Sequence, residues 1–108
     1  FPVAEADRAV NHALAVVSGN FATFLWNESA KAAAGRLGLD PATLFAPYFA
    51  SLVDRFVENP ADSLTGPVAR RDAATVEANL AALESEPRLY AAYEAFLGLA
   101  WPDDGRRN

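Results

Sequence analysis

Residues 10–24, VNHALAVVSGNFATF, decide the fold predicted for the first third of the chain. Their large apolar side chains recur at alternating steps of four and three residues, which is the spacing of one helix face. These side chains are Val10, Leu14, Val17, Phe21 and Phe24. No Pro interrupts the segment 4–36, and Gly35 and Gly38 supply stop signals at its end. The sequence therefore predicts one long helix with a continuous apolar face.

The opposite face of this predicted helix is small and polar. At ~100° per residue, four of its positions fall within an arc of roughly 80°, with Asn20 at the edge. They are His12, Gly19, Thr23 and Asn27. Two interpretations stay open: a solvated outer face whose glycine permits close helix packing, or a face that lines a cleft or a subunit contact.

A second helix is predicted from Pro41 to about Glu58. Asp40 can accept from the first free amides, and Pro41 suits the first helical position. Pro47 falls inside this segment, where it removes a backbone hydrogen bond and clashes with the preceding turn. We therefore expect a kink or a break at Pro47.

Two further helices follow. Asp72 is a good N-cap for a helix from about Ala73 to Glu84, and Pro87 begins the last helix. No segment alternates apolar and polar residues for long enough to form a strand. The predicted fold is all-α, a bundle of four or five helices.

The composition restricts the function. The chain has 108 residues, 52% of them hydrophobic, with a formal charge of -5, which is typical of a single soluble domain and unsuited to nucleic acid. It has no Cys and only one His, so no zinc or copper cluster is expected, and a reducing cytoplasm is compatible with it. No apolar run approaches the ~20 residues that span a bilayer. We expect a cytoplasmic protein without a metal, nucleic-acid or membrane partner.

The chain begins Phe1-Pro2 and contains no Met. We therefore expect residues 1–108 to form one helical domain, the C-terminal part of a longer protein.

The stretch SLTGPVARRD, residues 63–72, concentrates polar chemistry between two predicted helices. A Thr65-Gly66-Pro67 turn followed by Arg70 and Arg71, just before a helix N-terminus, could hold an anion. The alternative is structural: the turn only redirects the chain, Asp72 caps the next helix, and an arginine pairs with a carboxylate. Spacing alone leaves both interpretations open.

Two motifs resemble a known family. The segment LTGPVARRDAATVEANLAAL resembles the LTGP-I-A-R-G-D-A-x-T-V signature of the C-terminal helical domain of the domain of unknown function 2520 family. The segment VNHALAVVSGNF is similar to that family's pattern of a His followed eight residues later by an Asn and an aromatic residue. With the intervening GLDPATLFAPYF, the resemblance covers nearly the whole chain.

The resemblance implies a Rossmann-like, NAD(P)-binding domain upstream. The family's helical domain is similar to the C-terminal domains of 6-phosphogluconate dehydrogenase, ketopantoate reductase and pyrroline-carboxylate reductase, which close over the nicotinamide and often form the dimer. No glycine-rich phosphate fingerprint occurs in this chain, so we expect any NAD(P) to be bound mainly by the other domain.

The motif positions define the candidate site. Histidine ionises near neutral pH, so His12 is the natural general acid or base, and Asn20 would orient a substrate carbonyl or hydroxyl. Arg70 would clamp a carboxylate or phosphate. The expected substrate-binding residues are Thr65, Gly66, Pro67, Arg70 and Asp72. For His12 and Asn20 the alternative is an ordinary packing or subunit-contact role.

Three positions depart from the expected patterns. Arg71 stands where the family usually has Gly, and Asn11 where it usually has Tyr. If Asn20 corresponds to the Asn of related β-hydroxyacid dehydrogenases, Val16 occupies the position of their catalytic Lys and cannot transfer a proton. The dehydrogenase mechanism therefore does not carry over.

Two functions remain as hypotheses. The first is the substrate and dimerisation domain of an NAD(P)-dependent oxidoreductase, which is not catalytic by itself. The second is a non-catalytic dimerisation or ligand-binding module, in which the polar helix face and the 63–72 loop meet a partner chain.

Overall fold

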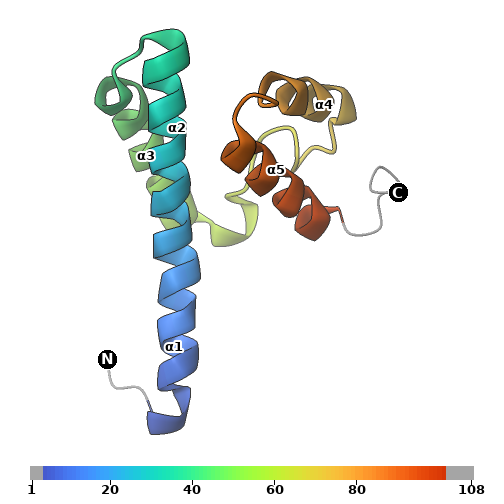
Figure 1. Cartoon of the computed structure of the whole chain (residues 1–108). Helices are drawn as coiled ribbons and strands as arrows, with labels where there is room; N and C mark the ends of the chain where they lie inside the picture. The colour runs from blue at the N-terminus through green and yellow to red at the C-terminus, as the bar shows by residue number, and fades with distance from the viewer. Residues whose placement is uncertain (1–3, 102–108) are drawn as a thin grey trace.

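The computed structural model describes residues 4–101 and consists of helices joined by short loops (Figure 1). A long rod is formed by α1 (Arg8–Ala15), the π-helical segment η2 (Val16–Phe21) and α2 (Ala22–Leu37). The other helices are α3 (Pro41–Glu58), α4 (Ala73–Ala82) and α5 (Pro87–Ala100), with short 3₁₀ turns η1 (Glu5–Asp7) and η3 (Pro60–Asp62). Residues 4–101 contain no strand, so the all-α prediction is confirmed, with four helices if the rod is taken as one.

The long rod ends where the sequence predicted, but it contains an irregularity that the sequence did not predict. Gly38 takes a left-handed conformation with φ 66° and terminates α2. Near the middle, the Ser18 hydroxyl donates to the Leu14 carbonyl at 2.7 Å, and the Thr23 hydroxyl donates to the Gly19 carbonyl at 2.8 Å. Hydroxyls that bond to carbonyls four residues back compete with the backbone ladder. Ser18 lies within the wide π turn of η2, and Thr23 follows it at the start of α2.

Helix α3 packs beside α2 (Figure 1). The Asp40 carboxylate accepts from the Thr43 amide at 3.2 Å, which confirms the predicted N-cap. The helix continues through Pro47, so the break allowed by the sequence does not occur. Aromatic rings hold the pair together: Trp26 of α2 stacks on Phe49 with centroids 4.4 Å apart.

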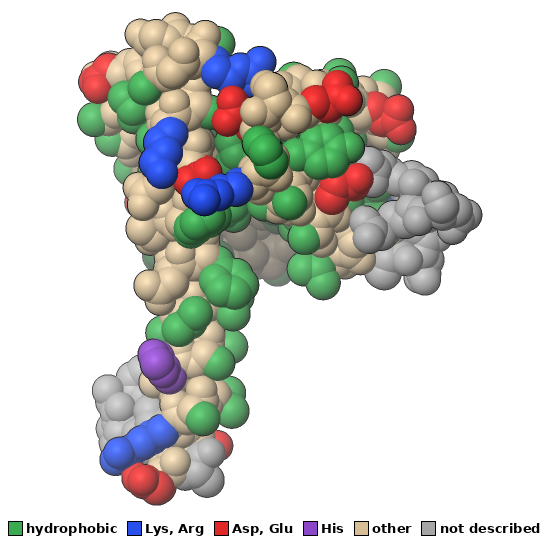
Figure 2. All heavy atoms as spheres, viewed as in Figure 1, with side chains coloured by type: hydrophobic (Ala, Val, Ile, Leu, Met, Phe, Trp, Pro, Cys, Tyr) green, Lys and Arg blue, Asp and Glu red, His purple; other side chains and the backbone are tan. Residues whose placement is uncertain are grey.

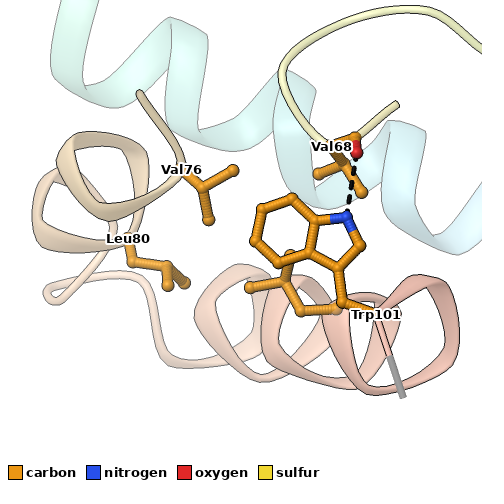
Figure 3. Close-up of a cluster of buried hydrophobic side chains, with 5 residues drawn as sticks. Val68, Val76, Leu80 and Trp101 are labelled. Carbon is orange, nitrogen blue, oxygen red and sulfur yellow. Dashed lines mark hydrogen bonds between the residues drawn. The ribbon is translucent and has the colours of Figure 1, made fainter. Parts of the chain in front are cut away.

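The hydrophobic core lies at the other end of the chain (Figure 3). Five buried side chains form it, and all come from residues 68–101: Val68, Val76, Leu80, Leu97 and Trp101. The indole nitrogen of Trp101 donates to the Val68 carbonyl at 3.0 Å. The loop before α4 is thereby fixed to the end of α5.

Polar contacts join these two parts of the molecule. The Arg36 guanidinium donates to the Ala82 carbonyl at the end of α4 at 3.0 Å, and Arg88 of α5 pairs with Glu28 of α2 at 3.4 Å. Exposed ion pairs of this kind each contribute about 0–1 kcal/mol. The arrangement is open: its radius of gyration is 16.2 Å, against about 13 Å for a compact domain of this size.

Replacing Trp101 should test how far the fold depends on this core. Trp101→Phe removes the donor to Val68 and part of a buried ring, so we expect the free energy of unfolding to fall by about 1–3 kcal/mol. Urea unfolding followed by circular dichroism measures it. Trp26→Phe is the matched control, because Trp26 is 40% exposed. An equal loss in both variants would contradict the special role of Trp101.

Candidate functional site

The 63–72 loop contains a single helical turn. A residue with positive φ stands at each end of this turn, Gly66 before it and Arg71 after it. Gly66 has φ 94°, a conformation that favours glycine, and turns the chain into residues 67–70. The Asp72 amide then donates to the Pro67 carbonyl at 2.9 Å, and the Arg71 amide donates to the Val68 carbonyl at 3.2 Å. This pair of bonds around a left-handed residue, Arg71 with φ 56°, is a Schellman motif.

Asp72 caps α4. Its carboxylate accepts from the Thr75 hydroxyl at 2.7 Å and from the Thr75 amide at 3.2 Å, and these two bonds lower the pKa of Asp72 below its usual value. The capping part of the structural interpretation is therefore confirmed. Thr75 donates one hydrogen bond to each carboxylate oxygen, and the substrate-binding role expected for Asp72 stays a prediction.

An open groove of about 510 Å³ lies where the loop meets α2, α4 and α5. Its walls are mainly apolar, including Leu25, Pro67 and Phe96. The polar atoms on its walls are neutral. The Thr65 hydroxyl accepts from Arg55 at 3.2 Å, and the Tyr93 hydroxyl accepts from the Asn79 amide at 3.1 Å while retaining its own proton to donate. The groove is suited to an apolar ligand with one hydrogen-bonding group.

The predicted site residues separate into three places. Thr65 and Pro67 line this groove, Gly66 forms its turn, and Arg70 is exposed on the same loop. Asn20 lines a second, almost wholly apolar groove of about 660 Å³ between the rod and α5. The two grooves share three wall residues and are therefore neighbours: Leu25, Ala92 and Phe96.

His12 is not among the wall residues of either groove, although Val16 of the Asn20 groove lies about one helical turn from it. His12 is exposed on α1, and 13 residues separate it from Leu25, which is about 20 Å along a helix axis. His12 is therefore remote from the loop within one chain. Among residues 4–101 there is also no group of three or more His, Asp or Glu side chains that could hold a metal ion.

The polar face of the rod has two different environments. Its upper part in Figure 1, which belongs to α2, meets α3: Asn27 and Ala30 lie with Phe45 and Phe49 around one shallow pocket. Its lower part is open, since a Cβ added at Gly19 would meet nothing within 4 Å. Helix packing is thus the role of the upper part.

The apolar face predicted for the rod is uncovered, and we call its five residues the apolar stripe. Their exposed fractions are Val10 58%, Leu14 63%, Val17 55%, Phe21 59% and Phe24 50%. Figure 2 shows hydrophobic side chains along the lower, N-terminal half of the rod. They lie on the same side of the rod as α5 (Figure 1). The signal for this exposure in the sequence is its charge pattern and not its periodicity: no Asp, Glu, Lys or Arg occurs in residues 9–27. A helix that faces water normally carries charge on its outer side.

Comparison with known proteins identifies the family. Residues 1–98 match the family model described as Domain of unknown function (DUF2520). The chain belongs to this family. No curated protein and no solved structure matches it, and within residues 4–101 every helix is too short or too polar to cross a membrane.

The Schellman motif gives a physical reason to expect glycine at the position of Arg71, as the resemblance implies. A left-handed residue costs a side-chain-bearing amino acid roughly 1–2 kcal/mol and costs glycine little. In this chain the Arg71 guanidinium lies 5.4 Å from the centre of the Trp101 ring, so a cation–π contact offsets part of that cost.

Two substitutions at Arg71 separate these effects. Arg71→Ala and Arg71→Gly both remove the cation–π contact, but only the glycine variant relieves the backbone. We expect Arg71→Gly to be more stable than Arg71→Ala by about 1 kcal/mol in urea unfolding. Equal stabilities would show that residue 71 does not hold a left-handed conformation in solution.

Proposed function

We propose that this DUF2520 domain is a dimerisation domain and that the apolar stripe is its contact surface. The observation that carries the proposal is a helix face of five large apolar side chains, each at least half exposed, on a segment without charged residues. Contiguous exposed apolar patches of this size are uncommon on monomers and mark interaction surfaces.

The area supports the same conclusion. The stripe is continued by Phe96 and Leu99 of α5, which are 39% and 81% exposed. Together these seven exposed side chains, three of them phenylalanines, offer on the order of 700 Å², close to the ~800 Å² per partner of a standard interface. The polar face, which the sequence offered for the partner contact, is a weaker candidate because α3 covers its upper part.

Solution mass tests this proposal. We expect the chain to be a dimer by sedimentation equilibrium, and Val17→Arg at the centre of the stripe to weaken association by at least about 100-fold, because a charge would be buried without a partner. Val57→Arg is the control, since Val57 is 74% exposed on α3 and lies outside the stripe. A wild-type chain that stays monomeric at high concentration would contradict the proposal.

A second candidate function is favoured by the grooves and the motif loop. We propose that the domain forms the substrate side of an NAD(P)-dependent oxidoreductase with 6-phosphogluconate dehydrogenase-like organisation, working with a Rossmann-like domain upstream. The support is the DUF2520 signature together with a groove that presents the hydroxyls of Thr65 and Tyr93. In this proposal Asn20 and Thr65 orient the substrate, while Arg70 attracts an anionic group at the loop. His12 is remote from the loop and lies about one helical turn from Val16 of the Asn20 groove, so in this proposal it would act at that groove and not at the loop.

Cofactor binding tests the second candidate. We expect NADPH or NADH to bind a protein that includes the upstream domain, and residues 1–108 alone to show no binding in calorimetry. Arg70→Ala should then raise the KM of an anionic substrate while leaving cofactor affinity unchanged. Absence of nicotinamide binding to the longer protein would sink the oxidoreductase proposal and leave dimerisation standing.

A further inference from the structure

We infer that two copies of this chain pair their rods antiparallel about Val17, so that the N-terminal half of each rod completes the Asn20 groove of the other copy. This inference rests on the proposed dimerisation and adds its register and its consequence for the groove. Three features of the structure carry it: the order of side-chain sizes along the stripe, the position of α5, and the composition of the groove.

The first feature is the order of side-chain sizes. The N-terminal half of the stripe carries Val10 and Leu14, and the C-terminal half carries Phe21 and Phe24. Antiparallel pairing about Val17 sets each small side chain opposite a phenylalanine of the second copy. Parallel pairing would stack phenylalanine on phenylalanine at one end and leave an underfilled layer at the other. Well-packed interfaces alternate large and small residues, which favours the antiparallel register.

The second feature is the place of α4 and α5. Both lie on one side of the upper rod, and the lower rod on that side is clear of them (Figure 1). In a parallel pair the two α4–α5 units would lie at the same height along the rods and would obstruct each other. In the antiparallel pair they lie at opposite ends, and the N-terminal half of each rod occupies the space beneath α5 of the other copy.

The third feature is the groove that this space contains. It is lined by Asn20, Phe21 and Phe24 from the rod and by Phe96 and Leu99 from α5, and it is open to solvent in the single chain. Val10 and Leu14 of the second copy would pack against the two phenylalanines of the rod and reach the exposed Leu99. The second copy thereby supplies the missing wall of the groove that holds Asn20.

Site-specific cross-linking tests the register cleanly, because the native chain has no Cys. Three variants are prepared: Val10→Cys, Val17→Cys and Phe24→Cys. In the antiparallel dimer residue 10 of one copy is beside residue 24 of the other, whereas the two copies of residue 10 are about 21 Å apart along the rods. With a short bismaleimide, we expect Val17→Cys to link to itself and a mixture of Val10→Cys and Phe24→Cys to link as a heterodimer. Neither of the latter two should link to itself.

Solution mass measured on the same samples separates failure of this inference from failure of the dimerisation proposal. A dimer in which Val10→Cys links to Val10→Cys and Phe24→Cys to Phe24→Cys is parallel, and the inference is then wrong while dimerisation stands. A dimer in which none of the three variants links uses another surface, which also overturns the register. A monomer overturns both.

A second variant keeps the test independent of thiol chemistry. Leu14→Glu and Phe21→Lys in one chain bring opposite charges together only in the antiparallel register. We expect the double variant to dimerise and Leu14→Glu alone to be monomeric. If the double variant is no better than the single one, the antiparallel register is wrong.

Discussion

The hydrogen bond from the indole of Trp101 to the carbonyl of Val68 joins the last helix to the loop that carries the family signature. Val68 belongs to the buried cluster, so the loop is held both by this bond and by packing against α4 and α5. The Schellman bonds to the Pro67 and Val68 carbonyls then hold Arg71 and Asp72 in place, and the Arg70 amide bonds to the Gly66 carbonyl. The position of Thr65 at the groove follows from that anchoring, because the chain has little freedom between Thr65 and the core.

The rod and α3 lack a comparable anchor. Among the described residues their only buried side chain is Ala33, and the contact between them depends on stacked aromatic rings that stay partly exposed. The polar links to α4 and α5 include an ion pair whose arginine is exposed and one bond to a helix end, which together stabilise weakly in water. Covering the apolar stripe would therefore do two things at once: bury apolar surface and hold the rod against α5. Association and stability are coupled in such an arrangement.

How much the sequence could predict depended on the range of the interaction. The Asp40 and Asp72 caps, the Gly38 stop and the Pro87 start act within a few residues, and all four were predictable from spacing. The π turn at η2 was not predictable, because hydroxyls such as those of Ser18 and Thr23 also occur in helices that stay regular. Periodicity located the apolar stripe but could not say what covers it, since the same pattern serves a core or a subunit contact. The distance from His12 to the loop could not be predicted either, because two motifs in one sequence do not say how the helices between them are arranged in space.

The chemistry open to the two grooves is limited by what lines them. Among the described residues, Tyr93 is the one ionisable side chain on the walls of the loop groove, and the walls of the Asn20 groove contain none. Val16, which also lines the Asn20 groove, stands where the resemblance to β-hydroxyacid dehydrogenases would put a lysine. These walls can orient a ligand by hydrogen bonds from Asn20, Thr65 and Tyr93 and can exclude water around its apolar part. A reaction that moves a proton near neutral pH needs a group with a matched pKa within hydrogen-bond reach, and these walls do not supply it; it would come from a neighbouring residue, a second copy, another domain or the ligand itself.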